Sequence, residues 1–352
     1  MFFGGKIKLI KKDIKSMLFE ELVDWAQKNE HKKFRAEQIF SWLHRQNVES
    51  FFEMKNISRQ IIDQLKGEFY INRIKIKKRL VSSMDNTVKY LYELEDGEFV
   101  ESVVMEYVFG KTVCISSQVG CKMGCLFCAS CKSGYIRNLT AAEMLDQFYS
   151  CQKDLGCEIG NVVIMGIGEP LDNYDNFIRF FKNISHPKGR NLGFRHITIS
   201  TCGLVDKIQM LAGERIPVNL SVSLHAPNDK IRKKIMPIAK KWSVDQLIDI
   251  CKKYVKMTNR RVTFQYACID GVNTSTKHAY ELSRLLKGMI CHVNLIPINP
   301  IPERSFRPAP SAKIYRFSEI LRDQGISVTI RRTLGQDINA SCGQLRRNSL
   351  DV

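Results

Sequence analysis

The chain has 352 residues, 44% of them hydrophobic, which is enough for one large domain and a smaller one with ordinary cores. Its formal net charge of +18 indicates a polyanionic partner, either nucleic acid or an acidic membrane surface; a merely solvated basic face is the plainer alternative. No run of 18 apolar residues and no apolar signal stretch occur, so we expect neither a membrane span nor secretion. Twelve cysteines in such a chain fit free thiols in a reducing cytoplasm better than a disulfide framework.

Residues 1–75 are predicted to form a small, basic, helical accessory domain. Apolar residues recur there at helical spacing, first at Leu18, Leu22 and Trp25 and then at Ile39, Phe40 and Leu43. Within residues 76–106, polarity alternates over 87–92, and a second apolar run follows the turn dipeptide Asp96-Gly97. We therefore expect a β-hairpin segment that links the accessory domain to the rest of the chain.

Residues 107–345 alternate between strand and helix patterns, before a short tail at 346–352. Strands are predicted at 112–117, 161–168, 196–200, 218–224, 261–269, 292–299 and 327–332. Helices are predicted between them at 140–154, 173–183, 205–214, 244–257, 276–288 and 311–324. Two of these helices start with capping boxes, Thr140 to Glu143 and Ser243 to Gln246. Repeated strand–helix units predict an α/β fold with a parallel sheet, without deciding between an open sheet and a barrel.

Three cysteines in the order C-x3-C-x2-C, Cys121, Cys125 and Cys128, are the most specific signal in the chain. A 4Fe-4S cluster normally takes four cysteine ligands, so a set of three leaves one iron open to a ligand that is not protein. An open iron can hold a cofactor and pass it an electron, which indicates radical chemistry. Two alternatives stay open. One is a structural zinc site, which would need a second ligand pair, and the other is a closed cluster with Cys131 as fourth ligand.

Unusual polar residues fall at the ends of several predicted strands: Glu169 after Gly168, Ser200, Ser223 and His225, and Asn299. In parallel α/β folds the carboxyl ends of the strands share one rim, where active sites form. The cysteine loop follows the first predicted strand onto the same rim. Each residue also has a structural alternative, such as a helix cap, a turn residue or a hydrogen-bonded histidine. Their coincidence beside a metal loop favours one common site.

The sequence resembles the radical S-adenosylmethionine RNA methyltransferases that methylate carbon 2 of an adenine in 23S ribosomal RNA and in tRNA. The matching stretches spread over most of 100–345, at 116–121, 125–128, 137–140, 168–171, 223–229, 294–297 and 340–345. The resemblance implies a partial (β/α) barrel of the radical S-adenosylmethionine type, with a small N-terminal helical domain and a β-hairpin extension. It also implies that the helical domain binds RNA.

Carried over by position, the resemblance implies a role for each site residue. The cluster ligands would be Cys121, Cys125 and Cys128. The contacts to S-adenosylmethionine would be Gly168, Glu169, Ser200, Ser223, Leu224, His225 and Asn299. Cys342 would become methylated, Cys114 would be its transient disulfide partner, and Glu101 would be the proton acceptor. On sequence alone, Cys114 could equally be core packing and Glu101 an ordinary exposed acid.

The implied chemistry explains why such a set is needed. Carbon 2 of adenine is electrophilic, so transfer of a methyl cation has no nucleophile to meet. One S-adenosylmethionine would methylate Cys342, and a second, cleaved reductively, would give the radical that activates the new methyl group. Addition to the base links protein and RNA; proton loss to Glu101 and attack by Cys114 on the Cys342 sulfur release the product. A reductant such as flavodoxin or ferredoxin and a monomeric enzyme are also expected.

Two other functions stay open at this point. The same chemistry at carbon 8 of the adenine gives antibiotic resistance, although Glu169-Pro170 and the segment 299–302 look more like the carbon-2 group. A non-catalytic iron–sulfur protein that binds RNA or carries electrons would need Cys131 as a ligand. The family usually has glycine at that position.

RNA binding is expected to follow RNA shape and a flipped adenine, with affinity that falls steeply as salt rises. The basic clusters available for phosphates are Lys6, Lys8, Lys11 and Lys12; Arg232, Lys233 and Lys234; Lys240 and Lys241; and Arg331, Arg332, Arg346 and Arg347.

Overall fold

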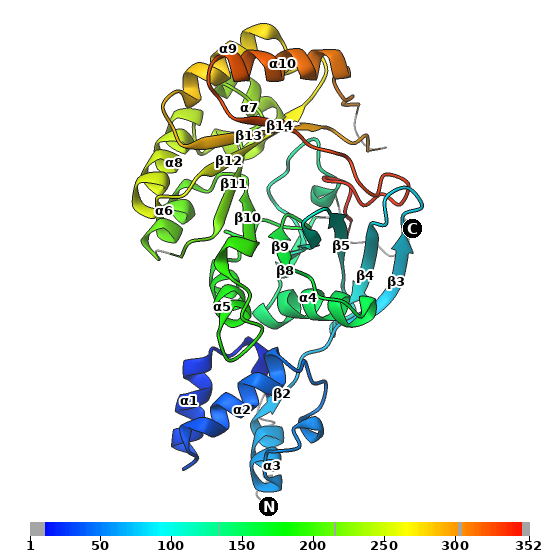
Figure 1. The fold of residues 1–352 in the computed structure, drawn as a ribbon, viewed down its shortest axis with the longest axis vertical. Helices are drawn as coiled ribbons and strands as arrows, with labels where there is room; N and C mark the ends of the chain where they lie inside the picture. Colours follow the sequence, from blue (N-terminus) through cyan, green and yellow to red (C-terminus); the bar gives the residue numbers. More distant parts are fainter. Residues whose placement is uncertain (1–10, 133, 215, 302–304, 347–352) are drawn as a thin grey trace, which may run out of the picture.

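The computed structural model describes residues 11–132, 134–214, 216–301 and 305–346, which form a small helical unit and a large α/β unit (Figure 1). The small unit contains β1 (Lys12–Asp13), the 3-10 helix η1 (Ile14–Ser16), α1 (Phe19–Lys28), α2 (Lys33–His44), η2 (Phe51–Glu53), α3 (Arg59–Glu68) and β2 (Phe69–Tyr70). Its core buries the apolar residues that recur at helical spacing, namely Leu22, Trp25, Ile39, Phe40 and Leu43. The predicted helical character of this part is confirmed. Lys6 and Lys8 lie outside the described residues.

Buried polar contacts join the small unit to α4 (Ala141–Leu155) and α5 (Tyr174–Ser185), which lie above it in Figure 1. Lys15 Nζ lies 2.7 Å from Asp146 Oδ1, and both side chains are almost inaccessible to solvent. Asn183 donates a hydrogen bond to the Lys15 carbonyl oxygen at 3.2 Å. Breaking a buried ion pair strongly destabilises a fold. The contacts therefore hold the two units in a defined orientation.

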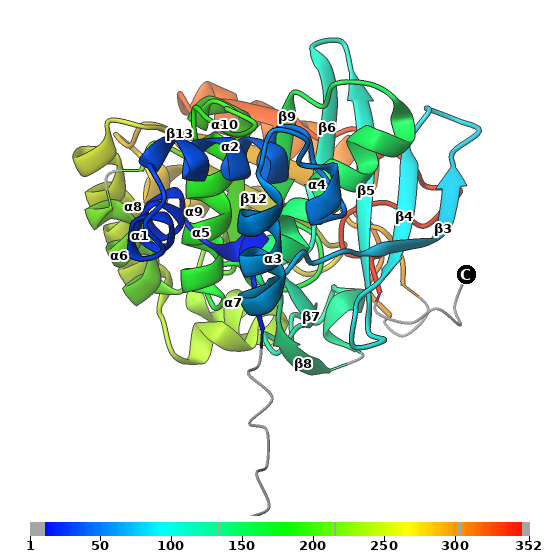
Figure 2. The same ribbon diagram turned by 90° about the horizontal axis from the view of Figure 1, so that it is seen from below.

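The large unit is built on a ten-stranded sheet in the order β14-β13-β12-β11-β10-β9-β6-β5-β4-β3. Neighbouring strands run parallel from β6 (Gly110–Ile115) through β9 (Asn161–Ile164), β10 (Ile197–Thr201), β11 (Asn219–Ser223), β12 (Val262–Cys268) and β13 (Cys291–Pro297) to β14 (Val328–Ile330). Beyond β6, the antiparallel strands are β5 (Phe99–Tyr107), β4 (Val88–Glu93) and β3 (Lys75–Val81). The edge strands β3 and β14 do not pair with each other in the described residues, so the curved sheet stays open (Figure 2). This is the mostly parallel α/β fold that the resemblance implied.

The remaining elements connect these strands. They are β7 (Gln118–Gly120), η3 (Ala129–Cys131), β8 (Tyr135–Asn138), η4 (Phe194–His196), α6 (Val205–Gly213), α7 (Asp229–Ile235), η5 (Pro237–Lys240), α8 (Val244–Thr258), α9 (Thr276–Leu286) and α10 (Ser311–Asp323). Every strand and helix predicted after residue 107 is present, and both capping boxes form as predicted. The turn at Asp96-Gly97 joins β4 to β5, so that segment extends the main sheet directly. The short β7, β8 and α7 were not anticipated, because so few residues carry no readable period.

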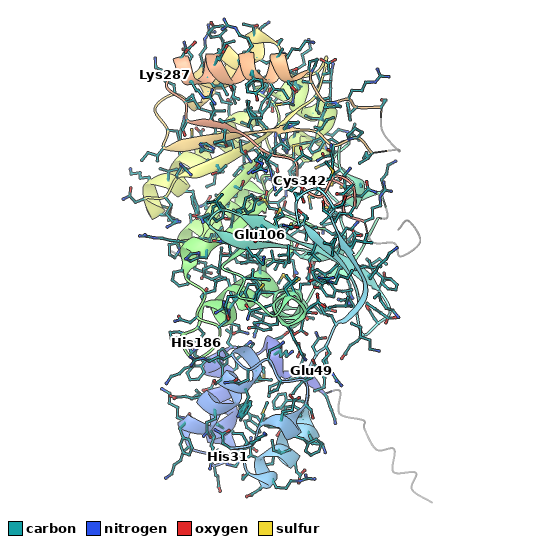
Figure 3. The ribbon with its side chains drawn as sticks, turned by 45° about the vertical axis from the view of Figure 1, so that its right-hand side comes forward. His31, Glu49, Glu106, His186, Lys287 and Cys342 are labelled. Atoms are coloured by element: carbon teal, nitrogen blue, oxygen red, sulfur yellow. The ribbon has the colours of Figure 1, made fainter. Side chains whose placement is uncertain are left out.

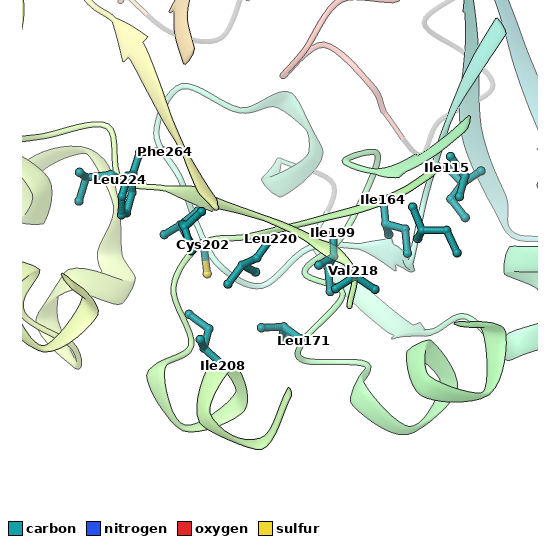
Figure 4. Close-up of a cluster of buried hydrophobic side chains, with 14 of the residues drawn as sticks. Ile115, Ile164, Leu171, Ile199, Cys202, Ile208, Val218, Leu220, Leu224 and Phe264 are labelled. Carbon is teal, nitrogen blue, oxygen red and sulfur yellow. The ribbon is translucent and has the colours of Figure 1, made fainter. Parts of the chain in front are cut away.

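The two faces of the sheet are covered differently. On one face, strand residues such as Ile164, Ile199, Leu220 and Phe264 pack with helix residues such as Ile208 in a continuous core (Figure 4). On the other face, the C-terminal segment packs against β5 and β6, in a second cluster that contains Val103, Met105, Cys114, Ala340 and Leu345. This second face is therefore where a cavity can form between the sheet and the C-terminal segment. No helix in the described ranges has the length and apolarity to cross a lipid bilayer.

Candidate active site

The loop that carries the predicted cluster ligands is fixed by backbone contacts at the carboxyl end of the sheet. The Leu126 N–H donates to the Ile235 carbonyl at 2.9 Å, and the Ala129 N–H donates to the Gly343 carbonyl at 2.8 Å. Gly120 enters the loop with φ +74°, and a Cβ there would lie 1.7 Å from the Gly134 carbonyl oxygen. Only glycine fits that position. The loop is thus built tightly between α7 and the C-terminal segment.

The three predicted ligands, Cys121, Cys125 and Cys128, lie close to the Cys131 thiol. The interaction with Cys131, followed by burial, raises the pKa of the three thiols. No set of three or more His, Cys, Asp or Glu side chains in the described part of the chain surrounds a metal position as placed. Cys121, Cys125 and Cys128 are free thiols on one short loop, and thiolates are the donors that a 4Fe-4S cluster takes.

A cavity of about 130 Å³ connects the cysteine loop with the ends of β9, β10 and β11. Its lining includes most of the residues expected to contact S-adenosylmethionine: Gly168, Glu169, Ser200, Ser223 and His225. Gly168 has φ +106°, and a Cβ there would lie 2.6 Å from the Cβ of Gln118. The chain therefore needs glycine here to bring the loop after β9 close to the cavity.

Glu169 is buried at the rim of this cavity and braces two strand-end loops. Its Oε2 accepts a hydrogen bond from the Cys202 N–H at 2.6 Å, and its Oε1 accepts one from the Leu171 N–H at 3.1 Å. Burial raises the pKa of the carboxyl, while these hydrogen bonds oppose the rise. The carboxylate thus has a structural use besides any contact to a bound cofactor.

His225 projects from the end of β11 with an unusual backbone conformation, φ +56°. Its Nδ1 accepts a hydrogen bond from the Ala267 N–H at 2.8 Å, which leaves the proton of the neutral ring on Nε2. Burial, together with the Arg232 charge, lowers the pKa of His225 to about 3. The Phe127 ring from the cysteine loop packs edge-on against it, with ring centroids 4.8 Å apart. The imidazole is therefore a neutral donor in the cavity.

Asn299 and Leu224 differ from the other predicted cofactor contacts. Asn299 lines an adjoining cavity with Ser200, Ser223 and Cys342, and its Nδ2 donates to the Cys342 carbonyl oxygen at 3.0 Å. The Leu224 side chain points into the hydrophobic core (Figure 4). The Leu224 N–H donates to Gln265, and its carbonyl accepts from a guanidinium. Leu224 therefore lines neither cavity.

Cys114 and Cys342 line one cavity of about 60 Å³ on the second face of the sheet, and Cys128 also reaches it. Cys114 comes from β6 and Cys342 from the C-terminal segment (Figure 3). Both are free thiols. Burial raises the pKa of Cys114 to about 12, and the nearby Arg331 guanidinium opposes that rise. The sheet thus brings together two thiols that are more than two hundred positions apart in the sequence.

Glu101 lies beside this cavity but does not line it. Its Oε1 is 2.7 Å from the Lys89 Nζ, and both side chains are at most 5% exposed. Its Oε2 accepts a hydrogen bond from the Arg346 N–H at 2.8 Å. Burial raises the pKa of the carboxyl, and the Lys89 charge opposes the rise. Glu101 is therefore a buried carboxyl under the C-terminal segment, not the exposed acid that the sequence also allowed.

One basic cluster needs correction. Arg232 was expected among the cations available for RNA phosphates, but its side chain is fully buried. Its Nη2 donates to the Cys202 carbonyl at 2.6 Å, and its Nε donates to the Leu224 carbonyl at 3.2 Å. It caps the ends of β10 and β11, because buried carbonyls at strand ends need donors. Lys233 and Lys234 remain exposed.

Two residues of this site went unrecognised in the sequence. Lys89 lies in the alternating run 87–92, where a strand lysine reads as a solvated residue. Arg331 was assigned to a basic surface cluster, yet it reaches the cavity of the two thiols. No local pattern distinguishes either residue, because their partners lie on other strands.

A mostly parallel α/β sheet with a three-cysteine loop after its first parallel strand defines an enzyme of the radical S-adenosylmethionine superfamily, and the family model described by that name matches residues 115–282. A second model, for the N-terminal domain of ribosomal RNA large subunit methyltransferases, matches residues 12–71. The chain belongs to the family of dual-specificity RNA methyltransferases called RlmN.

Relatives support this assignment over nearly the whole length. The chain is 51% identical to a probable dual-specificity RNA methyltransferase RlmN of Alkaliphilus metalliredigens over 341 residues, 97% of either chain. It is 50% identical to that of Clostridium novyi, over 96% of this chain and 98% of the relative. The crystal structure of a radical SAM methyltransferase from Sphaerobacter thermophilus superposes with a TM-score of 0.89 at 40% identity, covering 95% of this chain and 99% of that one.

Proposed function

We propose that this protein methylates carbon 2 of an adenine in 23S ribosomal RNA and in tRNA, through a methylated Cys342 and a covalent protein–RNA intermediate. The observation that carries the proposal is the shared cavity of Cys114 and Cys342, next to the cluster ligand Cys128. A reaction that needs two thiols in succession requires both to be free and to face one space, as they do here. The names of the relatives support RNA as the substrate.

The cofactors of the superfamily have matching residues. Cys121, Cys125 and Cys128 would hold a 4Fe-4S cluster, and the cavity lined by Glu169 and His225 would hold S-adenosylmethionine. With both bound, the cluster would reduce S-adenosylmethionine, and its cleavage would supply a carbon radical. We expect the enzyme to be a monomer in the cytoplasm. We expect its electron donor to be flavodoxin or ferredoxin.

Cys342 is the methyl acceptor in this proposal. Its thiolate attacks the methyl carbon of the sulfonium; the new carbon–sulfur bond forms as the old one breaks, and the bonding pair of the old bond goes to the departing thioether sulfur. Asn299 holds the Cys342 backbone carbonyl and so fixes the position of the thiol in the cavity. In the last stage the Cys114 thiolate attacks the Cys342 sulfur; a disulfide forms, and the bonding pair of the sulfur–carbon bond goes to the carbon that leaves with the base.

Glu101 is the proton acceptor in this proposal, and the Lys89 charge opposes the rise in its pKa that burial causes. Its second oxygen is occupied by the Arg346 N–H. Because Glu101 does not line the cavity of the two thiols, acceptance of a proton from the base requires the carboxylate and the base to come together.

The test is anaerobic reconstitution with iron, sulfide, S-adenosylmethionine, a reductant and a fragment of 23S ribosomal RNA or a tRNA. We expect 2-methyladenosine and 5′-deoxyadenosine to appear together by mass spectrometry. Cys114→Ala should stall as a protein–RNA adduct, while Cys342→Ala should form neither adduct nor product. Appearance of 8-methyladenosine would reassign the target atom, and unchanged activity of Cys342→Ala would refute the mechanism.

A further inference from the structure

The cavity of the two thiols opens to solvent on one side. Its liners Val103, Met105 and Cys114 are buried, whereas Arg332 and Thr333 are exposed. Tyr107, at the end of β5, and Arg331, just after β14, line the cavity and are half-buried between these extremes. The mouth of the cavity therefore lies between the β5–β6 hairpin and the segment that follows β14.

The hairpin at this mouth exposes apolar side chains. Tyr107 pairs with Gly110, so Val108 and Phe109 form the two-residue turn. Such turns favour asparagine and glycine, so turn formation does not explain this apolar pair. Val108 is fully exposed and Phe109 is 72% exposed. The hairpin projects beyond the neighbouring strands in Figure 2, and large exposed apolar groups of this kind often mark an interaction site.

The exposed ring continues into the cavity. The rings of Phe109 and Tyr107 are stacked, with centroids 5.0 Å apart and an angle of 5° between their planes. Tyr107 in turn lies close to Arg331, whose charge opposes the rise that burial causes in the Tyr107 pKa. An aromatic surface thus runs from solvent to a guanidinium inside the mouth, and a flat base could stack on its outer end.

The charges around the mouth suit a polyanion. Arg331 and the exposed Arg332 supply cations on the side opposite the hairpin. The acid on the hairpin, Glu106 (labelled in Figure 3), is 3.2 Å from Lys111 in an ion pair. Its negative charge is therefore compensated, and the mouth as a whole is positive. Aromatic faces beside arginines are the usual means of binding single-stranded nucleic acid.

We propose that Phe109 and Tyr107, together with Arg331 and Arg332, form a clamp for an unpaired nucleotide next to the target adenine. The base stacks on the exposed Phe109 face, and a neighbouring phosphate meets Arg332. The clamp rests on the proposed function, because it presumes an RNA loop whose adenine enters the cavity. It would hold the flanking nucleotide at the mouth while the adenine reaches the two thiols.

The test compares Phe109→Ala and Phe109→Leu with a control, Tyr315→Ala. Tyr315 lies on α10, is 60% exposed and does not line the cavity of the two thiols. The probe is an RNA stem-loop with 2-aminopurine beside the target adenine. We expect affinity to fall roughly tenfold or more in both Phe109 variants, because the aliphatic leucine cannot stack. The bound 2-aminopurine should be quenched by wild type and Tyr315→Ala only.

Two readouts separate the clamp from the proposed function. Methylation of Cys342 by S-adenosylmethionine, followed by mass spectrometry without RNA, should be the same in wild type and Phe109→Ala. A wild-type enzyme that never forms methylcysteine would refute the proposed function. Methylcysteine formation with RNA affinity and quenching unchanged in Phe109→Ala would refute the clamp alone. A change in sedimentation of Phe109→Ala with unchanged RNA binding would assign the hairpin to a protein contact and equally overturn the clamp.

Discussion

The buried pair of Lys89 and Glu101 gives a prediction whose size follows from the structure. Lys89→Met keeps the length of the side chain and removes its charge. Glu101 then keeps the Arg346 N–H as hydrogen-bond donor but loses a cation 2.7 Å away, at a place where its side chain is 1% exposed. Removal of one partner of a buried ion pair typically costs about 3–5 kcal/mol.

Protonation of Glu101 limits that cost. Burial raises the pKa of the carboxyl even with Lys89 present, and loss of the opposing Lys89 charge raises that pKa further. The unfolded carboxyl has a pKa of about 4.3, and each pH unit above it over which the folded carboxyl keeps its proton costs about 1.4 kcal/mol. Because the folded pKa is raised, the variant is closest to wild type below pH 4.3, and it loses stability as pH rises toward 7.

The assay is urea unfolding of wild type and Lys89→Met at several pH values, monitored by circular dichroism. We expect the free energy of unfolding of Lys89→Met to fall below that of wild type as pH rises from 5 to 7, by at most about 1.4 kcal/mol per unit, because the wild-type carboxyl, with its smaller rise in pKa, loses its proton first. The double variant Lys89→Met/Glu101→Gln carries neither charge and should recover most of the stability, as a double-mutant cycle measures. A Lys89→Met protein within about 0.5 kcal/mol of wild type at every pH would show that this pair is not held as a buried salt bridge.

Three further predictions concern single positions. Cys131→Ala should keep its iron and its cluster absorbance, because three thiols suffice; loss of the cluster would make Cys131 a ligand. Gly168→Ala should weaken S-adenosylmethionine binding and destabilise the fold by about 1–3 kcal/mol, because the φ of Gly168 is +106° and a Cβ there would meet Gln118. In calorimetry the control Gly213→Ala should bind S-adenosylmethionine normally, because a Cβ at Gly213 meets open space. Burial lowers the pKa of His44 to about 3, so wild type loses about 1.4 kcal/mol of stability per pH unit at this residue as pH falls from 6.5 to 4.5. His44→Phe should remove that loss. An unchanged slope of stability against pH in urea unfolding would contradict the burial of His44.

The sequence by itself determined the parts of this protein that depend on local spacing. Three thiols within eight residues are neighbours in any compact fold, so the metal loop was readable from Cys121 to Cys128. The strands and helices after residue 107 were readable for the same reason, since burial imposes a period on a contiguous segment. The sequence also placed Gly168 correctly, close to the carboxyl end of a strand.

Only the tertiary structure decided which distant residues meet. Pairing of β5 with β6, and packing of the C-terminal segment over them, set Cys342 in one cavity with Cys114 and buried Glu101 against Lys89. The same packing sent Arg232 inward to strand-end carbonyls, although its sequence neighbours are exposed lysines. A charged side chain is free to face water or a buried partner, and only the folded chain supplies the partner that makes burial favourable.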